Sequence, residues 1–330
     1  MRSFDYYPAS SWEDAIEVLT KYENAKPIAG GSDLLGWIKD DLHGPGAPRS
    51  EILVDIRTIP DTSYINFDAS TGLEIGALTN LTSIEESAEV QANYLGLAQA
   101  AAAPASPSIR NTGTLGGNLL QRPRCWYLRG REFACYKKGG DFCFAVTGEN
   151  QYHCILEGEL CYIVHPSDTA PALIALDAMA NIATSSGRKD VSFDDFFVGP
   201  RVNVLKETML EPNELLTGVS IPQPSANTKS TFLKVTQRDV LDFAIVSVAA
   251  AGQIENGVWQ DGRIVLGGVA PTPYRATEAE DVLRGQQISE ALVRDAAERA
   301  LLDARPMTYN AYKVGIAKNL IKQAVMSLAA

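Results

Sequence analysis

Two glycine-rich stretches, Ala29-Gly30-Gly31-Ser32-Asp33-Leu34 and Thr114-Leu115-Gly116-Gly117-Asn118, decide how this sequence is interpreted. The first follows a short apolar run and leads into an apolar helical pattern, so it predicts a strand-to-helix turn. A glycine backbone approaches a ligand closely, and the free N–H groups of the following helix suit a phosphate or pyrophosphate. The stretch matches neither the Gly-x-Gly-x-x-Gly nor the Walker A pattern. Taken alone, it is equally consistent with an ordinary turn.

The second stretch belongs to a longer polar segment. Between Arg110 and Asn118 it holds three glycines, two threonines and two asparagines, flanked by two apolar helical patterns. Such a segment turns tightly and is rich in hydrogen-bond donors. One glycine turn is weak evidence for a ligand. Two turns, each flanked by helix signals, indicate the two ends of an extended dinucleotide.

Composition and charge exclude several classes of protein. The chain has 330 residues, 45% of them hydrophobic, which is ordinary for a globular protein and predicts two or three domains. Its formal net charge of −11 argues against a nucleic-acid binder. The residues at the start do not resemble a signal peptide, and no apolar run reaches the roughly 18 residues of a membrane span. By its own signals we expect a cytoplasmic protein.

The pattern of hydrophobic and turn-forming residues changes near residue 222. Before it, residues 1–57 and 58–222 read as two α/β subdomains. After it, two apolar runs joined at Asn256-Gly257 predict a β-hairpin, and the chain then becomes helical. We therefore expect an α/β domain over 1–222 and a separate C-terminal α+β domain over 223–330.

The two glycine stretches together resemble the FAD-binding subunit of the molybdenum hydroxylase (xanthine dehydrogenase) family. Segments 76–79, 165–176, 214–222, 232–235 and 268–276 also look like this family, so the resemblance covers nearly the whole chain. It implies an α+β protein with the vanillyl-alcohol oxidase or PCMH-type FAD-binding fold, built from two α/β subdomains. It also implies a C-terminal α+β domain like that of CO dehydrogenase flavoproteins.

The resemblance implies contacts to FAD residue by residue. Those implied at the pyrophosphate are Ala29, Gly30, Gly31, Ser32 and Asp33, the last of which is better suited to capping a helix than to binding an anion. Those implied at the ribityl–pyrophosphate and flavin region are Thr114, Gly117 and Asn118, with Ser106, Arg110, Asn111 and Thr112 nearby and Thr79 in the same cleft. Asp168 is implied on the adenosine side, and Leu216 and Lys234 close to the isoalloxazine or adenine. No catalytic residue is implied.

All five cysteines fall within the segment 121–161, which we call the cysteine loop. They contain no Cys-x2-Cys pair, so the usual zinc ribbons and thioredoxin-like sites do not fit. Four thiolates from one loop can hold a [4Fe–4S] cluster. Cations that would stabilise such a cluster are close in sequence: Arg122, Arg124, Arg129, Arg131, Lys137 and Lys138. The alternative is a group of reduced, buried thiols.

Within the family, the chain resembles the subset that carries a [4Fe–4S] cluster, such as the flavin subunits of periplasmic aldehyde oxidoreductases. This resemblance implies Cys125, Cys135, Cys143 and Cys161 as ligands and leaves Cys154 over. The choice between Cys154 and Cys161 as fourth ligand stays open. His153 and His165 are alternative ligands, although histidines beside a cluster are more often structural.

The function implied is electron transfer within an oxidoreductase. A molybdenum-cofactor large subunit would oxidise the substrate, a [2Fe–2S] small subunit would relay electrons, and FAD would pass them to oxygen, a quinone, ferredoxin or NAD. Two rivals are a self-contained FAD-dependent oxidase and a non-enzymatic four-cysteine zinc module. The resemblance implies that members of this subset can be exported with a partner carrying a twin-arginine signal, so the periplasm is the alternative location.

Overall fold

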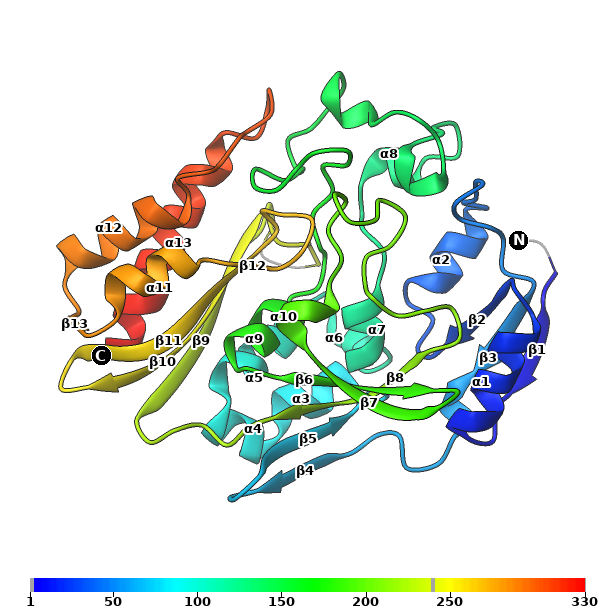
Figure 1. The fold of residues 1–330 in the computed structure, drawn as a ribbon, viewed down its shortest axis with the longest axis horizontal. Helices are drawn as coiled ribbons and strands as arrows, with labels where there is room; N and C mark the ends of the chain where they lie inside the picture. The colour runs from blue at the N-terminus through cyan, green and yellow to red at the C-terminus, as the bar shows by residue number, and fades with distance from the viewer. Residues whose placement is uncertain (1–2, 239–240, 330) are drawn as a thin grey trace.

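The computed structural model describes residues 3–238 and 241–329 and arranges them around three sheets (Figure 1). The first sheet is parallel, in the order β1-β3-β2. Its elements in chain order are β1 (Asp5–Pro8), α1 (Trp12–Lys21), β2 (Ala25–Ile28), α2 (Leu34–Lys39), β3 (Ile52–Asp55) and the 3₁₀ turn η1 (Ile56–Thr58). Ser11 caps α1 by accepting a hydrogen bond from the N–H of Asp14. The expected turn from strand to helix at Gly30 therefore lies between β2 and α2.

The second sheet is antiparallel, in the order β4-β5-β8-β6-β7. Its strands are β4 (Ile65–Asp68), β5 (Gly72–Gly76), β6 (Met179–Thr184), β7 (Gly187–Ser192) and β8 (Leu215–Ile221). The helices that accompany it are α3 (Leu81–Glu86), α4 (Ala88–Asn93), α5 (Leu95–Ala102), α6 (Pro107–Arg110), α7 (Leu115–Leu120), α9 (Thr169–Ala175) and α10 (Phe193–Phe196). One apolar cluster holds the sheet, α5, α7 and α9 together.

The third sheet has the order β12-β11-β10-β9, and β13 pairs with β11. Its elements are β9 (Thr228–Val235), β10 (Val246–Glu255), β11 (Val258–Gly267), β12 (Tyr274–Arg275), α11 (Thr277–Leu283), β13 (Gln286–Gln287), α12 (Glu290–Ala300) and α13 (Tyr312–Ala329). The predicted hairpin is confirmed, because Asn256 and Gly257 connect β10 to β11 with φ of +52° and +77°. The three helices cover one side of this sheet in Figure 1.

Most of the cysteine loop lacks regular structure. It contains only short turns: α8 (Trp126–Arg129), η2 (Tyr136–Lys138) and η3 (Phe144–Val146). In Figure 1 the segment around α8 lies at the top of the view, above α7 and between α2 and the C-terminal helices. The loop therefore borders all three sheet-based parts of the molecule.

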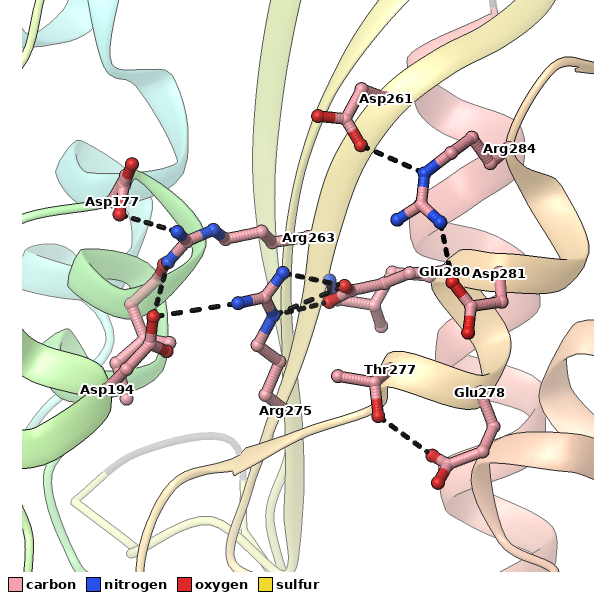
Figure 2. Close-up of polar contacts among 12 residues, drawn as sticks. Asp177, Asp194, Asp261, Arg263, Arg275, Thr277, Glu278, Glu280, Asp281 and Arg284 are labelled. Atoms are coloured by element: carbon pink, nitrogen blue, oxygen red, sulfur yellow. Dashed lines mark hydrogen bonds and ion pairs between the residues drawn. The ribbon is translucent and has the colours of Figure 1, made fainter.

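Ion pairs join the third sheet to the turn after α9 and to α10, which accompany the second sheet (Figure 2). Arg263 on β11 contacts Asp177 at 2.5 Å and Asp194 at 3.0 Å. Arg275 contacts Asp194 at 3.5 Å and the buried Glu280 at 2.9 Å. Two arginines of the C-terminal part thus share one aspartate of the preceding part. No helix among the described residues is long and apolar enough to cross a membrane.

Candidate functional site

The two glycine turns touch each other. A Cβ built on Gly30 would lie 2.1 Å from the carbonyl oxygen of Thr112, so only glycine permits this approach. Gly31 has a φ of +69°, in the left-handed region that favours glycine. The sequence predicted these turns as two separate contacts to one ligand. The structure places their backbones side by side.

The second turn is fixed by capping and by the end of the second sheet. Thr114 caps α7, since its Oγ1 accepts from the N–H of Gly117 at 3.0 Å. The N–H of Gly116 donates to the carbonyl of Ala77 at 2.8 Å. A Cβ on Gly116 would lie 3.1 Å from that same oxygen. Close packing of the helix start against the strand end therefore explains the glycine.

Asn118 connects this turn to the segment that carries Asp168. Its Oδ1 accepts from the hydroxyls of Ser167 at 2.6 Å and Thr169 at 2.7 Å, and all three side chains are buried. Asp168 forms a buried ion pair with Lys234 at 2.6 Å. Burial raises the pKa of Asp168 above its usual range, while Lys234 opposes the shift. The sequence named Asn118, Asp168 and Lys234 separately, and the structure brings them together.

A cavity of about 370 Å³ opens beside Asp168. Four parts of the chain line it: the segment before α9, the cysteine loop, the segment that joins β9 to β10 together with the start of β10, and the residue that follows β11. Its described lining residues are Arg124, Cys125, Trp126, Tyr152, His153, Ile163, Val164, His165, Pro166, Ser167, Asp168, Gln237, Arg238, Asp242, Phe243, Ala244, Ile245, Ser247 and Gly268. Its size and mixed lining suit a ring system with polar edges.

Several polar atoms on this cavity lack a protein partner. Among the described residues, six buried side-chain nitrogen or oxygen atoms have no hydrogen-bond partner. Three of the six belong to lining residues, namely Arg124 Nε, His165 Nε2 and Ser247 Oγ. Because buried polar groups are almost always paired, such a concentration points to a polar ligand in this cavity.

Most of the predicted FAD contacts lie outside this cavity. Among its described lining residues, Asp168 is the one that the sequence had named as an FAD contact. The hydroxyl of Thr79 accepts a hydrogen bond from the N–H of Tyr64 and donates one to the carbonyl of the same residue. Arg110 forms an ion pair with Glu85 at 3.0 Å. Ser106 caps α6, and Leu216 is buried in the core of the second sheet. Asn111 and Thr112 are exposed.

The sequence named none of the other lining residues as an FAD contact, although Arg124, Cys125, His153 and His165 had been singled out as cations or candidate ligands beside the thiols. His165 and Ser167 stand in the stretch that leads to Asp168, so the resemblance already pointed at them. Phe243 and Ser247 offered no signal, because a phenylalanine and a serine near the start of a strand are unremarkable on their own. Only the meeting of the strand with the cysteine loop gives them a place in the site.

All five cysteines are free thiols, and four of them are buried. Cys143 and Cys161 share a hydrogen bond, which lowers the pKa of Cys143 and raises that of Cys161. Burial raises the pKa of Cys125 to about 11 and that of Cys154 to about 12. Across the part of the chain that is described, no three His, Cys, Asp or Glu side chains are arranged to hold a metal ion.

The basic residues of the cysteine loop are paired with distant acids. Asp33, which was expected to cap α2, instead binds Arg129 at 2.7 Å, Arg124 at 3.0 Å and the N–H of Arg122 at 2.9 Å; no side-chain cap bond forms. The reason is that two guanidinium groups attract its carboxylate more strongly than backbone N–H groups do. The first glycine turn is thereby tied to the cysteine loop.

Further along the cysteine loop, buried basic residues also pair with an acid from a distant segment. The buried Lys137 pairs with Glu207 at 3.0 Å, and Arg122 shares the same carboxylate. Lys137 favours the thiolate form of Cys161, and Lys138 lies close enough to Cys135 to interact with its charge. Cations therefore accompany the thiols in space, as the sequence predicted.

The start of α13 holds the far end of the loop. The side chain of Asn310 donates to the carbonyls of His153 and Cys154, both at 3.0 Å. Lys313 is buried and donates from Nζ to the carbonyls of Tyr152 at 3.0 Å and Gly268 at 2.8 Å. His153 in turn places Nε2 3.3 Å from the sulfur of Cys125. The C-terminal part of the chain thus supports one wall of the cavity.

Comparison with known families accounts for nearly the whole chain. Residues 2–224 match the family described as FAD binding domain in molybdopterin dehydrogenase. Residues 231–328 match the CO dehydrogenase flavoprotein C-terminal domain. These matches confirm the predicted family and the predicted fold class.

Individual relatives agree with the family matches. The chain is 33% identical to the aldehyde oxidoreductase FAD-binding subunit of Escherichia coli (strain K12), over 97% of this chain and 96% of that protein. It is 27% identical to the xanthine dehydrogenase FAD-binding subunit of Escherichia coli O157:H7, over 89% and 87% of the two chains. A chain in the solved structure of carbon monoxide dehydrogenase from Hydrogenophaga pseudoflava superposes with a TM-score of 0.77 at 27% identity, covering 100% of this chain and 99% of that one.

Proposed function

The chain belongs to the family of FAD-binding subunits of molybdenum hydroxylases, and from this premise we propose that it transfers electrons through FAD and a [4Fe–4S] cluster. In this proposal the substrate is oxidised on a molybdenum-cofactor large subunit, and a [2Fe–2S] small subunit relays the electrons. The relative in Escherichia coli (strain K12) is named as an aldehyde oxidoreductase subunit, which supports aldehydes as the substrate class of the complex.

The observation that carries the FAD proposal is the cavity with three unpartnered buried polar atoms, Arg124 Nε, His165 Nε2 and Ser247 Oγ. Ser167 lines this cavity and is bonded to Asn118, which stands four residues after Thr114 at the second glycine turn. We place the pyrophosphate at the glycine turns and the flavin ring in the cavity, which puts Asp168 beside the ring and not on the adenosine side that the family resemblance implies. Bound FAD accepts electrons singly and passes on one or two.

The chain's own residues hold and shape the flavin in this proposal. The first turn contributes backbone N–H groups, whereas those of Asn111–Gly113 and Leu115–Asn118 in the second turn already donate within the protein. Asp168 lines the cavity, and its carboxylate is neutralised by the ion pair with Lys234. The histidines on the cavity are neutral near pH 7, because burial lowers the pKa of both His153 and His165 to about 4. The lining therefore orients a ring without supplying a proton-transfer pair, as suits electron transfer.

We propose Cys125, Cys135, Cys143 and Cys161 as the ligands of the [4Fe–4S] cluster. Each cysteine of such a cluster binds a different iron atom, so the four sulfurs need not converge on one ion position. The buried thiols, their mutual electrostatic interactions and the neighbouring Lys137 fit a negatively charged cluster. Cys154 is almost fully buried, interacts with the charge of Lys313, and is left as a buried thiol.

Co-purification of the chain with its partners tests this function. We expect one FAD, four irons and four labile sulfides per chain, in addition to molybdenum and the iron of the small subunit. Reduction of the isolated chain by aldehydes would instead support a self-contained oxidase, and a colourless protein with stoichiometric zinc would support a zinc module.

A matched pair of variants tests the ligand choice. Cys161→Ser is expected to lose the cluster's iron and visible absorbance, while Cys154→Ser keeps both, because only the former removes a proposed ligand. Iron content is read together with FAD content, so that a general folding defect is recognised by loss of both. Loss in Cys154→Ser with retention in Cys161→Ser would reverse the assignment.

A further inference from the structure

We propose that Arg124 of the cysteine loop donates a hydrogen bond from Nε to the flavin ring and stabilises the negative charge of the reduced ring. This inference rests on the proposed function, in which the ring occupies the cavity. It makes the cysteine loop part of the flavin site, and it makes Arg124 a residue that sets the flavin's tendency to accept electrons.

The contacts of Arg124 leave one nitrogen for a ligand. Its Nη1 lies 3.0 Å from Asp33, and its Nη2 donates to the side chain of Gln121 at 3.3 Å. Its Nε is buried and has no partner, and the residue lines the cavity. Because the guanidinium is planar and two of its nitrogens are held by the protein, the free Nε has a fixed direction. A buried donor of this kind is costly unless a ligand accepts from it.

The ring of Phe243 holds the guanidinium from the opposite segment. The guanidinium carbon of Arg124 stands 4.9 Å from the centre of that ring, a cation–π distance. Phe243 also lines the cavity, and it follows Asp242 in the segment that joins β9 to β10. Arg124 is therefore held between two segments that both border the cavity.

The charges around the cavity leave a net positive charge at Arg124. The single carboxylate of Asp33 faces two guanidinium groups, those of Arg124 and Arg129, so one positive charge remains uncompensated. The other charged lining groups are paired, Asp168 with Lys234 and Arg238 with Asp242. Since flavin gains electrons and can become anionic when reduced, a neighbouring cation favours the reduced form.

The test compares three variants in the purified, flavin-loaded complex: Arg124→Gln, Arg124→Lys and Arg131→Gln. Arg131 is on the same loop, is exposed and lies 3.8 Å from Asp41, so its loss removes the same charge without touching the cavity. The readouts are the flavin reduction potential and the dissociation constant of the sulfite adduct, which forms on the ring and carries a negative charge.

We expect Arg124→Gln to weaken sulfite binding by about tenfold or more, because a charge-assisted hydrogen bond contributes about 1.5–3 kcal/mol. For a two-electron couple a tenfold change corresponds to a potential lower by about 30 mV. Arg124→Lys keeps the charge and should fall between wild type and Arg124→Gln. Arg131→Gln should match wild type.

The outcomes separate this inference from the proposed function. If wild-type complex contains no FAD, the proposed function fails and the inference with it. If FAD is present and Arg124→Gln leaves both the potential and the sulfite affinity unchanged, the inference alone is overturned. If Arg124→Gln cannot retain FAD, the comparison of Arg124→Lys with wild type decides, and identical values there would also overturn it.

Discussion

The glycine-turn region (residues 25–34 and 111–118) and the cysteine loop are built in opposite ways. In the first, each turn ends in a regular helix, α2 or α7, and its shape follows from glycines and a threonine cap within a few residues. In the second, short turns are held by side chains from distant segments, among them Asp33, Glu207 and Lys313. Damage to the first should therefore be local, whereas damage to the second can come from far away in the sequence.

We expect the largest effect on FAD binding from Gly30→Ala, a change that disturbs only the glycine-turn region. The new Cβ would lie 2.1 Å from the Thr112 carbonyl oxygen, so the two turns must separate. We expect FAD affinity to fall by about 100-fold or more, equivalent to about 3 kcal/mol. Flavin content after gel filtration and titration of the apoprotein with FAD measure this loss.

Gly36→Ala in α2 is the matched control for Gly30→Ala. A Cβ on Gly36 meets no atom within 4 Å, so FAD binding should be unchanged. The helix should gain up to about 1 kcal/mol, since alanine is the better helix former. Normal FAD affinity in Gly30→Ala would show that contact between the turns does not shape the proposed pyrophosphate site.

Lys313→Met removes hydrogen bonds by which the C-terminal helix α13 supports the cysteine loop. It leaves the carbonyls of Tyr152 and Gly268 without their buried donor, so we expect a loss of about 2–3 kcal/mol in the free energy of unfolding. Chemical denaturation measures it. Lys318→Met on the same helix removes only a partly exposed pair with Glu298 and should cost less than about 1 kcal/mol. Equal losses of unfolding free energy in both variants would mean that the hydrogen bonds from Lys313 do not stabilise the cysteine loop.

The pH dependence of the unfolding free energy is a second test of the buried amine of Lys313. Burial lowers the pKa of Lys313 from 10.5 to about 7, so between these values the folded chain binds fewer protons than the unfolded chain. Stability contributed by this group therefore rises with pH across that window, by up to about 1.4 kcal/mol per pH unit. The difference in unfolding free energy between wild type and Lys313→Met should follow this slope above pH 7 and flatten below it. A constant difference from pH 7 to 10 would contradict the shift.

The same contrast explains which parts of the protein could be predicted from its sequence. The hairpin at Asn256-Gly257 was predictable, because a type I′ turn needs residues that accept positive φ. The role of Asp33 was not, since its arginine partners stand about ninety residues away and only the folded chain brings them together. The cavity was not predictable either, because Phe243 and Ser247 become lining residues only where the fold brings them beside Arg124 and His165.

Asp33→Asn is expected to have the smallest effect and to act on the two regions in opposite directions. The cysteine loop loses a partly buried carboxylate shared by Arg124 and Arg129, so stability should fall by about 1 kcal/mol. The proposed pyrophosphate site loses a negative charge at the start of α2, so FAD should bind slightly more tightly. Denaturation and FAD titration of one variant measure both changes. Asp40→Asn at the exposed end of α2 is the control, because the same change of charge there should alter neither. Weaker FAD binding in Asp33→Asn would mean that the carboxylate supports the pyrophosphate turn directly, and the two regions would then be one structural unit.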